Sequence, residues 1–479
     1  MKIVILNGSP KGELSITLQY VHYLEIQFPQ HQFQVFHVAE RIKVLEKNKT
    51  EFNTVVEAVR NSDAVLWSFG LWVLLVSAQY IRFIELIYER GVDDIFAGKY
   101  SAALSTSINY FDHTAHNYMR AVCEDLKMRF VDGISFDMMD LTKENKRLNL
   151  ITFFQTLINS IERGSRTSTL FERPSENQFT YQPASSDPTV DQRGKKILLL
   201  TDESDKDANL AKMTSRFSEL FLQDINIIDL SDIDIRGACL GCMKCGYNYQ
   251  CQYKDGFSNF YNDTVRNADI IVIAGQIKNR FLSSKWKTFF DRAFFWNHTP
   301  SLENKQIAYL VSGSIRQNQN LVQFFEASVT ARQNANLVDI ISDESGDSGI
   351  IDDQLANLAQ RLVFFSQVGH IKPQNFLAIG GHKIFRDNVW GRLRGIWQAD
   401  HRFYKRSGYY DFPQKYWLKR IQSAILITLT AIPGFRKKFY NNLKKFPAMR
   451  FGKLIEKLGI ESHLRPIPEN GKYSKHLKN

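Results

Sequence analysis

Short runs of apolar residues alternate with longer amphipathic stretches through most of the chain. Continuous apolar runs bounded by turn residues are typical of strands buried on both faces of a parallel sheet, whereas apolar residues three or four apart indicate helices. Over the first part of the chain this pattern predicts helices at 18–28, 50–60, 78–89 and 114–128, and strands at 2–6, 34–38, 64–68, 100–104 and 130–136. Strands that alternate with helices in this way predict an α/β domain with a parallel sheet, whose ligands bind beyond the carboxyl ends of the strands.

A second series of the same kind begins at Lys195. It predicts helices at 208–221 and 258–266, and strands at 195–200, 224–229, 270–274 and 307–311. Two segments also match in sequence, since 269–275 resembles 63–69 and 287–292 resembles 82–85. We therefore interpret the chain as a tandem duplication of one domain.

The segment between the two series is rich in serine and proline and has no apolar periodicity. At about thirty residues it is too long for an ordinary connection inside one domain, so it is predicted to be a linker. The predicted organisation is a first domain at 1–164, a linker at 165–194, a second domain at 195–379, and a basic, mainly helical extension at 380–479.

The composition is that of an ordinary globular protein, with 44% hydrophobic and 23% charged residues among 479. The formal net charge of +11 is unevenly distributed, because residues 380–479 hold 22 Lys and Arg against 6 Asp and Glu. This basicity is local and no nucleic-acid-reading module is recognisable, so nucleic acid is not an expected partner. The sequence predicts neither a secretory signal nor a membrane span, which favours a cytoplasmic location.

One segment of the extension, residues 417–432, becomes apolar nearly all round after its first few positions. Basic residues lie on both sides of it, and Arg436-Lys437-Lys438 follows. This arrangement suits a helix that lies in a membrane interface and gives the protein a peripheral location. The alternative interpretation is a helix buried against the tandem domains or against a partner chain.

The first predicted strand ends in Asn7-Gly8-Ser9-Pro10-Lys11, and a helix begins after Ser15. A loop of this composition between strand and helix presents backbone N–H groups and the helix N-terminus to a phosphate. The hydroxyls of Ser9, Ser15 and Thr17 would add donors. The sequence has neither a P-loop nor a G-x-G-x-x-G pattern here. A tight turn followed by a capped helix is the alternative interpretation.

Four of the five cysteines fall in one short run of spacing C-x2-C-x2-C-x5-C, at Cys239, Cys242, Cys245 and Cys251. Compact runs of this kind hold iron–sulfur clusters, although the ferredoxin spacing differs. Structural zinc usually takes its ligands from two separated knuckles. Zinc, redox-active thiols and a relic without metal remain open, whereas disulfides fit a cytosolic protein poorly.

The first domain resembles the NADPH-dependent FMN reductase family of the flavodoxin-like superfamily. The resemblance covers residues 1–160 and rests on the first loop, on 62–66 with 76–78, and on Ser105-Thr106-Ser107. It implies a five-stranded sheet of order 2-1-3-4-5 and an FMN whose phosphate and ring contact Gly8, Ser9, Pro10, Lys11, Ser15, Thr17, Trp72, Ser105, Thr106 and Ser107. The family often has Pro-x-Tyr where this chain has Gly70-Leu71-Trp72. Trp72 is therefore expected either to stack on the ring or to lie in a buried surface between domains.

The second domain resembles the same family, and more specifically its iron–sulfur flavoprotein branch. In that branch a similar cysteine run is implied to hold a 4Fe–4S cluster, whose ligands here would be Cys239, Cys242, Cys245 and Cys251. The first loop departs from the family, because it carries one lysine against four carboxylates, Asp202, Glu203, Asp205 and Asp207. A phosphate there would meet a repulsion of about 1 kcal/mol per close carboxylate. We therefore expect no FMN in the second domain.

The resemblance implies an NAD(P)H-dependent FMN oxidoreductase that passes electrons to a small-molecule or protein acceptor, with a 4Fe–4S cluster as one option for a relay. No residue is predicted to be catalytic. Relatives dimerise with flavins at the interface, which implies either a pseudo-dimer within the chain or a homodimer. In the pseudo-dimer the cysteine run of the second domain would face the FMN of the first. The competing hypothesis is a non-enzymatic, degenerate tandem scaffold that the basic extension anchors to a membrane or a partner.

Overall fold

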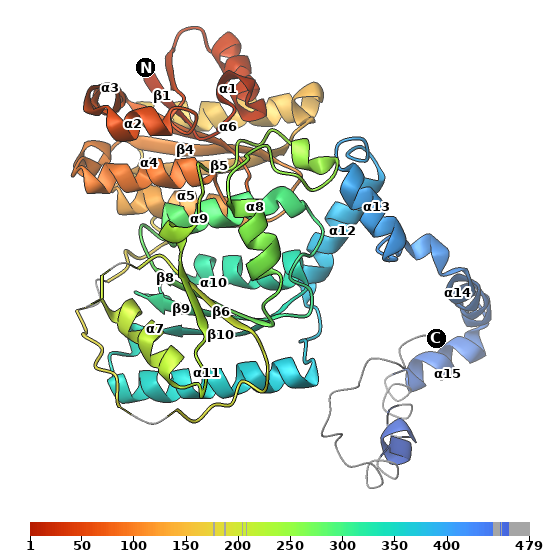
Figure 1. Cartoon of the computed structure of the whole chain (residues 1–479). Coiled ribbons are helices and arrows are strands. Elements are labelled where there is room, and N and C mark those ends of the chain that lie inside the picture. The colour runs from red at the N-terminus through yellow and green to blue at the C-terminus, as the bar shows by residue number, and fades with distance from the viewer. Residues whose placement is uncertain are drawn as a thin grey trace. The chain divides into compact units, whose positions relative to one another are not determined.

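The computed structural model describes residues 1–175, 178–185, 188–203, 205–206, 208–443, 451 and 453–458. The chain forms two compact units, Met1–Phe403 and Tyr404–Asn479. The first unit contains both sheets (Figure 1). Much of the last part of the predicted extension lies outside the described residues, and the predicted domain boundaries stay predictions.

The first of the two repeated domains, here called copy one, contains a parallel sheet in the order β2-β1-β3-β4-β5, which confirms the predicted topology. The second is called copy two. Its strands are β1 Lys2–Asn7, β2 Gln32–Phe36, β3 Ala64–Gly70, β4 Tyr100–Ser107 and β5 Arg129–Asp137. Its helices are α1 Ile16–Gln27, α2 Ile42–Lys47, α3 Lys49–Arg60, α4 Ala78–Glu89, α5 Asp112–Asp125 and α6 Glu144–Glu162. The second strand ends earlier than predicted because His37 leaves the sheet to contact Asn7 and Glu13.

Copy two repeats this topology in the order β7-β6-β8-β9-β10, again with all strands parallel. Its strands are β6 Ile197–Thr201, β7 Asn226–Asp229, β8 Ile270–Gln276, β9 Gln306–Ser312 and β10 Asn336–Ser342. Its helices are α7 Asn209–Glu219, α8 Phe257–Phe260, α9 Ser284–Arg292, α10 Gln319–Glu326 and α11 Ser348–Val368. The single helix predicted at 258–266 is instead the short α8 followed by a π-helical turn, Tyr261–Val265.

The two sheets are joined through matching helices. Helices α1 and α6 cover the outer face of the first sheet, and α7 and α11 cover the outer face of the second (Figure 1). Between the sheets, α4 packs against α9 and α5 against α10. Their buried side chains form one apolar cluster that spans both copies and includes Tyr80, Phe83, Trp286 and Phe290. Corresponding elements therefore meet as they do in a two-fold symmetric dimer.

Two carboxylates make this contact reciprocal. Glu85 is the eighth residue of α4, and Asp291 is the eighth residue of α9. Asp291 accepts the first backbone N–H of α4, at Ala78, with an N–O distance of 2.9 Å. Glu85 accepts the first backbone N–H of α9, at Ser284, with an N–O distance of 2.6 Å. Each copy thus places a negative charge at the positive end of the other copy's helix.

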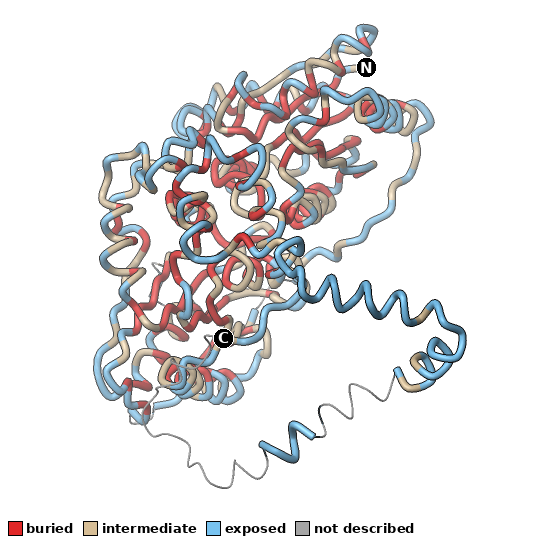
Figure 2. The backbone as a smooth tube through the Cα atoms, turned by 90° about the vertical axis from the view of Figure 1, so that its right-hand side faces the viewer, coloured by how far each residue is buried: buried red, intermediate tan, exposed pale blue. Residues whose placement is uncertain are grey.

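The extension begins with α12 Phe376–Trp390 and α13 Gln398–Arg406. The second unit contains α14 Trp417–Thr430 and α15 Pro433–Asn442, whose backbone is coloured as exposed almost throughout in Figure 2. Of the helices that the structure describes, none is long and apolar enough to cross a bilayer.

Candidate functional site

The first loop follows β1 at the carboxyl edge of the first sheet. Asn7 fixes its turn, because its side-chain oxygen accepts the Ser9 N–H at 3.1 Å and its amide donates to the Gly12 carbonyl at 3.1 Å. Gly8 has no room for a side chain, since an added Cβ would lie 2.4 Å from the Tyr80 ring of α4. Packing against α4 therefore requires the predicted glycine.

The N-terminus of α1 lies at this loop. Ser15 has the extended backbone of a cap residue, but its side chain does not cap the helix. Ser9 and Ser15 are both buried. The Thr17 hydroxyl donates to the Phe69 carbonyl at 3.0 Å and lies 2.7 Å from the Thr106 hydroxyl. The structure thus joins residues predicted from the first and third loops, and the uncapped helix end remains the strongest anion-attracting feature here.

Lys11 turns toward copy two. Burial lowers the pKa of its ammonium group, while the nearby thiols of Cys239 and Cys242 act in the opposite direction. Its Nζ lies 5.9 Å from the centre of the Trp72 ring. The Lys11 side chain therefore reaches from the first loop of copy one toward the cysteine run of copy two.

The second loop is a tight turn at Trp72. The Trp72 N–H donates to the Leu75 carbonyl at 2.7 Å, and the Leu75 N–H returns the bond at 3.0 Å. The indole lies directly over Gly241 of the cysteine run, where an ideal Cβ would be 1.7 Å from the ring. Lys287 of α9 donates to the Trp72 carbonyl at 3.0 Å. Of the two predicted roles for Trp72, this geometry corresponds to the surface between domains.

The third loop follows β4. Its hydroxyls have separate partners: Ser105 contacts His116 Nε2 at 2.8 Å, and Ser107 accepts the Asn109 N–H at 2.8 Å. Burial lowers the pKa of His116 to about 4. Further along, Tyr110 packs on Phe385 of α12 with ring centres 4.4 Å apart. The third loop is therefore held both by its own helix and by the extension.

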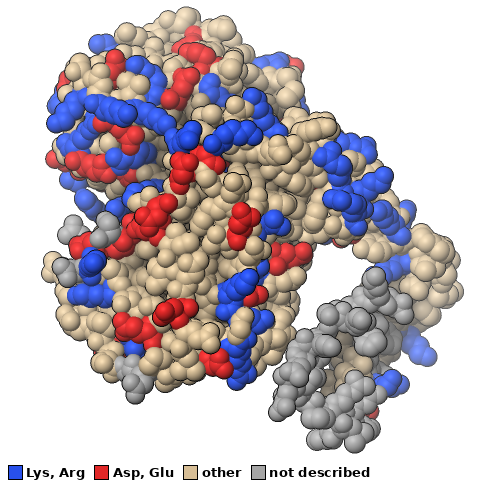
Figure 3. All heavy atoms as spheres, viewed as in Figure 1, with Lys and Arg blue, Asp and Glu red and all other residues tan. Residues whose placement is uncertain are grey.

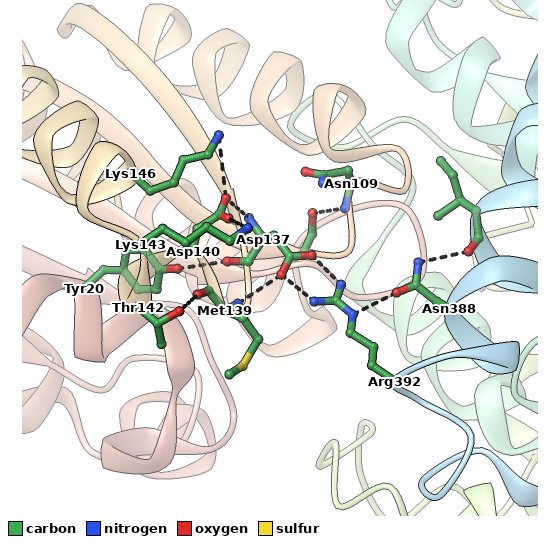
Figure 4. Close-up of polar contacts among 12 residues, drawn as sticks. Tyr20, Asn109, Asp137, Met139, Asp140, Thr142, Lys143, Lys146, Asn388 and Arg392 are labelled. Atoms are coloured by element: carbon green, nitrogen blue, oxygen red, sulfur yellow. Dashed lines mark hydrogen bonds and ion pairs between the residues drawn. The ribbon is translucent and has the colours of Figure 1, made fainter.

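Figure 4 shows how the extension also reaches the end of β5. Arg392 follows α12 and donates both terminal nitrogens to the Asp137 carboxylate, one at 2.6 Å. These hydrogen bonds lower the pKa of Asp137. Asp140 accepts the Asp137 N–H at 3.0 Å and the Lys143 ammonium at 2.8 Å. The extension thus rims the carboxyl edge of copy one next to the third loop.

The cysteine run of copy two contacts copy one at α4. Gln79 of α4 donates to the Cys239 carbonyl at 3.0 Å. Burial and neighbouring thiols raise the pKa of Cys245 to about 12, and burial raises the pKa of Cys239 to about 12. No disulfide links any of the five cysteines.

The predicted 4Fe–4S cluster finds no support in the side-chain positions. Among the described residues, which include all four cysteines of the run, no group of three or more His, Cys, Asp or Glu side chains is placed to hold a metal ion. Cys242 is exposed, whereas Cys239 and Cys245 are half-buried. The donor types suit iron and sulfide, and no electron-transfer step is derived through such a cluster.

The equivalent edge of copy two is covered by its own chain. Asp202 bonds the Ser283 hydroxyl, and burial raises the pKa of this carboxyl. The linker crosses the same edge: Asn209, at the start of α7, bonds the backbone of Phe179 and Tyr181 at 2.8 Å each. Tyr181 is fully buried. Of the predicted acidic loop, Asp207 lies outside the described residues.

Further linker contacts continue along the second and third loops of copy two. Arg280 donates to the Glu172 carbonyl at 2.6 Å. The Ser175 N–H donates to Gln317 at 2.8 Å, and the Ser314 hydroxyl donates to the Ser175 carbonyl at 3.1 Å. The described part of the linker, which was predicted from its lack of pattern, thus contacts all three loops of this edge.

Copy one, in contrast, offers polar atoms that fit FMN. The hydroxyl of Ser68 and the indole nitrogen of Trp72 are buried without a hydrogen-bond partner among the described residues. Together with the uncapped end of α1 they supply donors at the carboxyl edge. Glu40 opposes an anion here, because its carboxylate lies beside Gly12. The donors fit a phosphate ester and a polar ring, so the residues of copy one suit the cofactor and those of copy two do not.

Two parallel sheets of this strand order, each with its loops gathered at the carboxyl edge, define a tandem protein of the flavodoxin-like class. A family model described as NADPH-dependent FMN reductase matches residues 1–139 and again 196–337. The chain therefore belongs to the NADPH-dependent FMN reductase family, as two tandem copies, and is an oxidoreductase. No curated protein matches the chain in sequence.

Several solved structures are similar to part of the chain. An apo NADH:FMN oxidoreductase (EMOB) is 16% identical over 35% of this chain and 91% of its own, with a TM-score of 0.29. General stress protein 14 of Treponema denticola, solved in complex with FMN, is 11% identical over 34% and 98%, with a TM-score of 0.25. The NAD(P)H:(acceptor) oxidoreductase FerB of Paracoccus denitrificans is 13% identical over 33% and 97%, with a TM-score of 0.25.

Sequence reasoning missed the groups that join the copies at this site. Lys287 and Asp291 form a fully buried ion pair on one face of α9. Their spacing of four residues among aromatic residues is the sequence pattern that could have predicted this pair. Gly241 carried no such signal, because its partner Trp72 lies far away in sequence. Nothing in the sequence distinguishes Arg392 from the many other Lys and Arg residues of the extension.

Proposed function

We propose that the chain is an NAD(P)H-dependent FMN oxidoreductase with one flavin site, at the carboxyl edge of copy one. The observation that carries this proposal is the contrast between the two edges. Neither α1 nor α7 has a side-chain cap, but α1 begins beside a hydroxyl-lined loop, whereas the linker and its own carboxylates cover the corresponding edge of copy two.

The residues of copy one have distinct roles in this proposal. The phosphate is held by the N-terminus of α1 with Gly8, Ser9, Pro10, Lys11, Ser15 and Thr17. The ring lies between the second and third loops, bordered by Trp72, Ser105, Thr106 and Ser107. A bound FMN would supply the chemistry of hydride and electron transfer from NAD(P)H to an acceptor. The fixed polar groups position the cofactor, and no side chain is assigned a proton-transfer role.

Copy two contributes the closing surface. Gly241 lies under the Trp72 indole, and the Cys239 carbonyl accepts a hydrogen bond from Gln79. These contacts hold the second loop of copy one and exclude water from its outer side. Lys287 supports the same loop at the Trp72 carbonyl. In this proposal the site belongs to the pair of copies and not to one copy alone.

The cysteine run lies next to this site, and as a second candidate function we propose that it holds a 4Fe–4S cluster, which would supply one-electron transfer. The run lies against Trp72 and beside Lys11. Iron and sulfide analysis after anaerobic purification decides it. Replacing all four cysteines with serine is expected to remove any iron absorbance and leave FMN bound, and loss of both would contradict the separation of the two sites.

The test of the main proposal adds one negative charge at the N-terminus of α1. Ser15→Asp places a carboxylate at the N-cap of α1, where it caps the helix but repels a phosphate. We expect FMN to bind at one per chain in the natural protein and at least about tenfold more weakly in this variant. The matched control is Ala208→Asp, at the N-cap of α7 in copy two.

Fluorescence titration with FMN and an NADPH oxidation assay read out both variants. The control is expected to keep both affinity and activity. Two FMN per chain, or equal weakening by the two variants, would overturn the assignment to copy one. Unchanged FMN affinity in Ser15→Asp would show that the phosphate does not lie at α1.

A further inference from the structure

The second unit carries an apolar stripe that the described part of this unit leaves exposed. Trp417, Ile421, Ile425 and Leu429 are spaced by four along α14, so they form one stripe on the helix surface. Their exposed fractions are 60%, 50%, 56% and 38%, and the neighbouring Leu418 is 58% exposed. Nearly half of the exposed large apolar side chains of the described chain lie between residues 416 and 458. Exposed apolar area of this density marks an interaction surface.

The charges around the stripe are all of one sign. From Phe412 to Leu443 the sequence contains six Lys and Arg and no Asp or Glu. The helical spacing places Lys419 and Arg420 of α14 off the stripe. Lys and Arg are prominent on the extension in Figure 3. The exposed apolar side chains of α14 are therefore flanked by cations at the start of the helix and beyond its end.

Helix α15 repeats this arrangement. Phe435 and Phe439 lie one turn apart, with ring centres 6.2 Å apart and planes at 10°. The exposed Tyr440 contacts Phe439, with ring centres 5.4 Å apart, and Lys437 lies on the far side of the helix from Phe435 and Phe439. Two successive helices of the same unit thus combine an apolar side with cations.

We propose that α14 and α15 bind the surface of an anionic lipid bilayer, with their apolar sides at the boundary between headgroups and acyl chains. A stripe of Trp, Ile and Leu with flanking Lys and Arg is the chemistry that such a surface recognises. A helix of 14 residues is about 21 Å long, shorter than the hydrocarbon core of about 30 Å, so it lies in the interface and does not span it.

Charge also argues against a second copy of this chain as the occupant. Two such faces brought together would oppose cation to cation, with no acidic residue between 412 and 443 to compensate. Anionic lipid headgroups complement the same cations. The lipid surface is therefore the occupant that satisfies both the apolar stripe and the cations.

The experiment uses the full chain with two kinds of vesicle, phosphatidylcholine alone and phosphatidylcholine mixed with phosphatidylglycerol. In a flotation assay we expect the protein to float with the anionic vesicles only, and less so as salt is added. The double variant Ile421→Asp with Ile425→Asp is expected to weaken binding by more than about tenfold. Lys419→Gln with Arg420→Gln is expected to weaken it by about fivefold per charge.

Lys47→Gln with Lys49→Gln is the matched control, because it removes two exposed lysines of copy one and is expected to change nothing. Thermal unfolding of each variant shows whether the variant remains folded. Three results would overturn the proposal: no flotation of the natural protein, equal flotation with neutral vesicles, or binding that survives the aspartate substitutions. A concentration-dependent dimer that the same substitutions abolish, without flotation, would instead make a second copy the occupant.

Discussion

The two copies share a fold and an interface but differ at the edge where ligands bind. Counting from the ends of β1 and β6, the Gly8 position of copy one is held in copy two by Asp202, and the Lys11 position by Asp205. The N-cap of the first helix is Ser15 in copy one and Ala208 in copy two. Buried strands and paired helices tolerate little change because they share one core. Loop positions outside this core are freer to change, so function can be lost on one side while the fold is kept on both.

The largest expected effect tests whether Asp291 and Glu85, which cap each other's helices, contribute equally to the free energy of unfolding. Asp291 is 1% exposed and bonds the buried Lys287 as well as the end of α4, whereas Glu85 pairs with the partly exposed Arg82. Asp291→Ala leaves a buried ammonium without its counter-ion, and it should lower the free energy of unfolding by about 3–5 kcal/mol. Glu85→Ala should cost only about 1–2 kcal/mol.

Urea denaturation of both variants measures the difference. Equal losses would mean that the two halves of the contact are energetically symmetric despite the buried Lys287. Lys287→Met combined with Asp291→Leu removes both charges and serves as the control, because a fully apolar replacement of the pair should recover much of the loss.

A smaller effect concerns acid sensitivity in copy one. Burial holds the pKa of His116 at about 4, against 6.5 for an exposed histidine. Between these values the unfolded chain binds a proton that the folded chain does not. The free energy of unfolding should therefore fall as the pH drops from about 6.5 to about 4, by up to roughly 3 kcal/mol.

The substitution His116→Gln should flatten this part of the stability–pH curve, as measured by urea midpoints across the range. His113→Gln is the control, since His113 lies one turn away on the same helix and is exposed. If both variants keep the natural slope, another group governs the acid transition.

The smallest expected effect probes the contact of the cysteine run with copy one. Gly241→Ala must accommodate both a φ of +63° and the Trp72 ring at 1.7 Å from the new methyl group. Gly346→Ala has a nearly equal φ of +66° but open space around it. The first variant should therefore be about 2 kcal/mol less stable than the second.

Thermal or urea unfolding gives this difference directly. Adding Trp72→Ala to Gly241→Ala should recover part of the loss, because the ring that clashes is gone. Equal stability of the two alanine variants would mean that the cysteine run moves away from Trp72 at little cost.

The fold was predictable because its signals are local. Apolar strands such as 64–68 and 270–274 and the helix at 78–89 follow from patterns within a few residues, and the duplication follows from comparing them. The contacts of Trp72 with Gly241, and of Arg392 with Asp137, join segments more than 150 residues apart. No local pattern contains such contacts, so the sequence offered two roles for Trp72 and none for Arg392. The packed course of the linker escaped prediction for the same reason, since Tyr181 is buried by tertiary neighbours.

The exchange of helix caps between Glu85 and Asp291 has an evolutionary consequence. In a homodimer every substitution occurs twice, so an acidic loop that expels a phosphate would disable both sites at once. Joining the halves in one polypeptide keeps them together at any dilution and makes each half a separate target for mutation. One half can then lose its ligand-binding function and keep only the surface that closes the site of the other half. Identical chains in a symmetric assembly cannot diverge in this way.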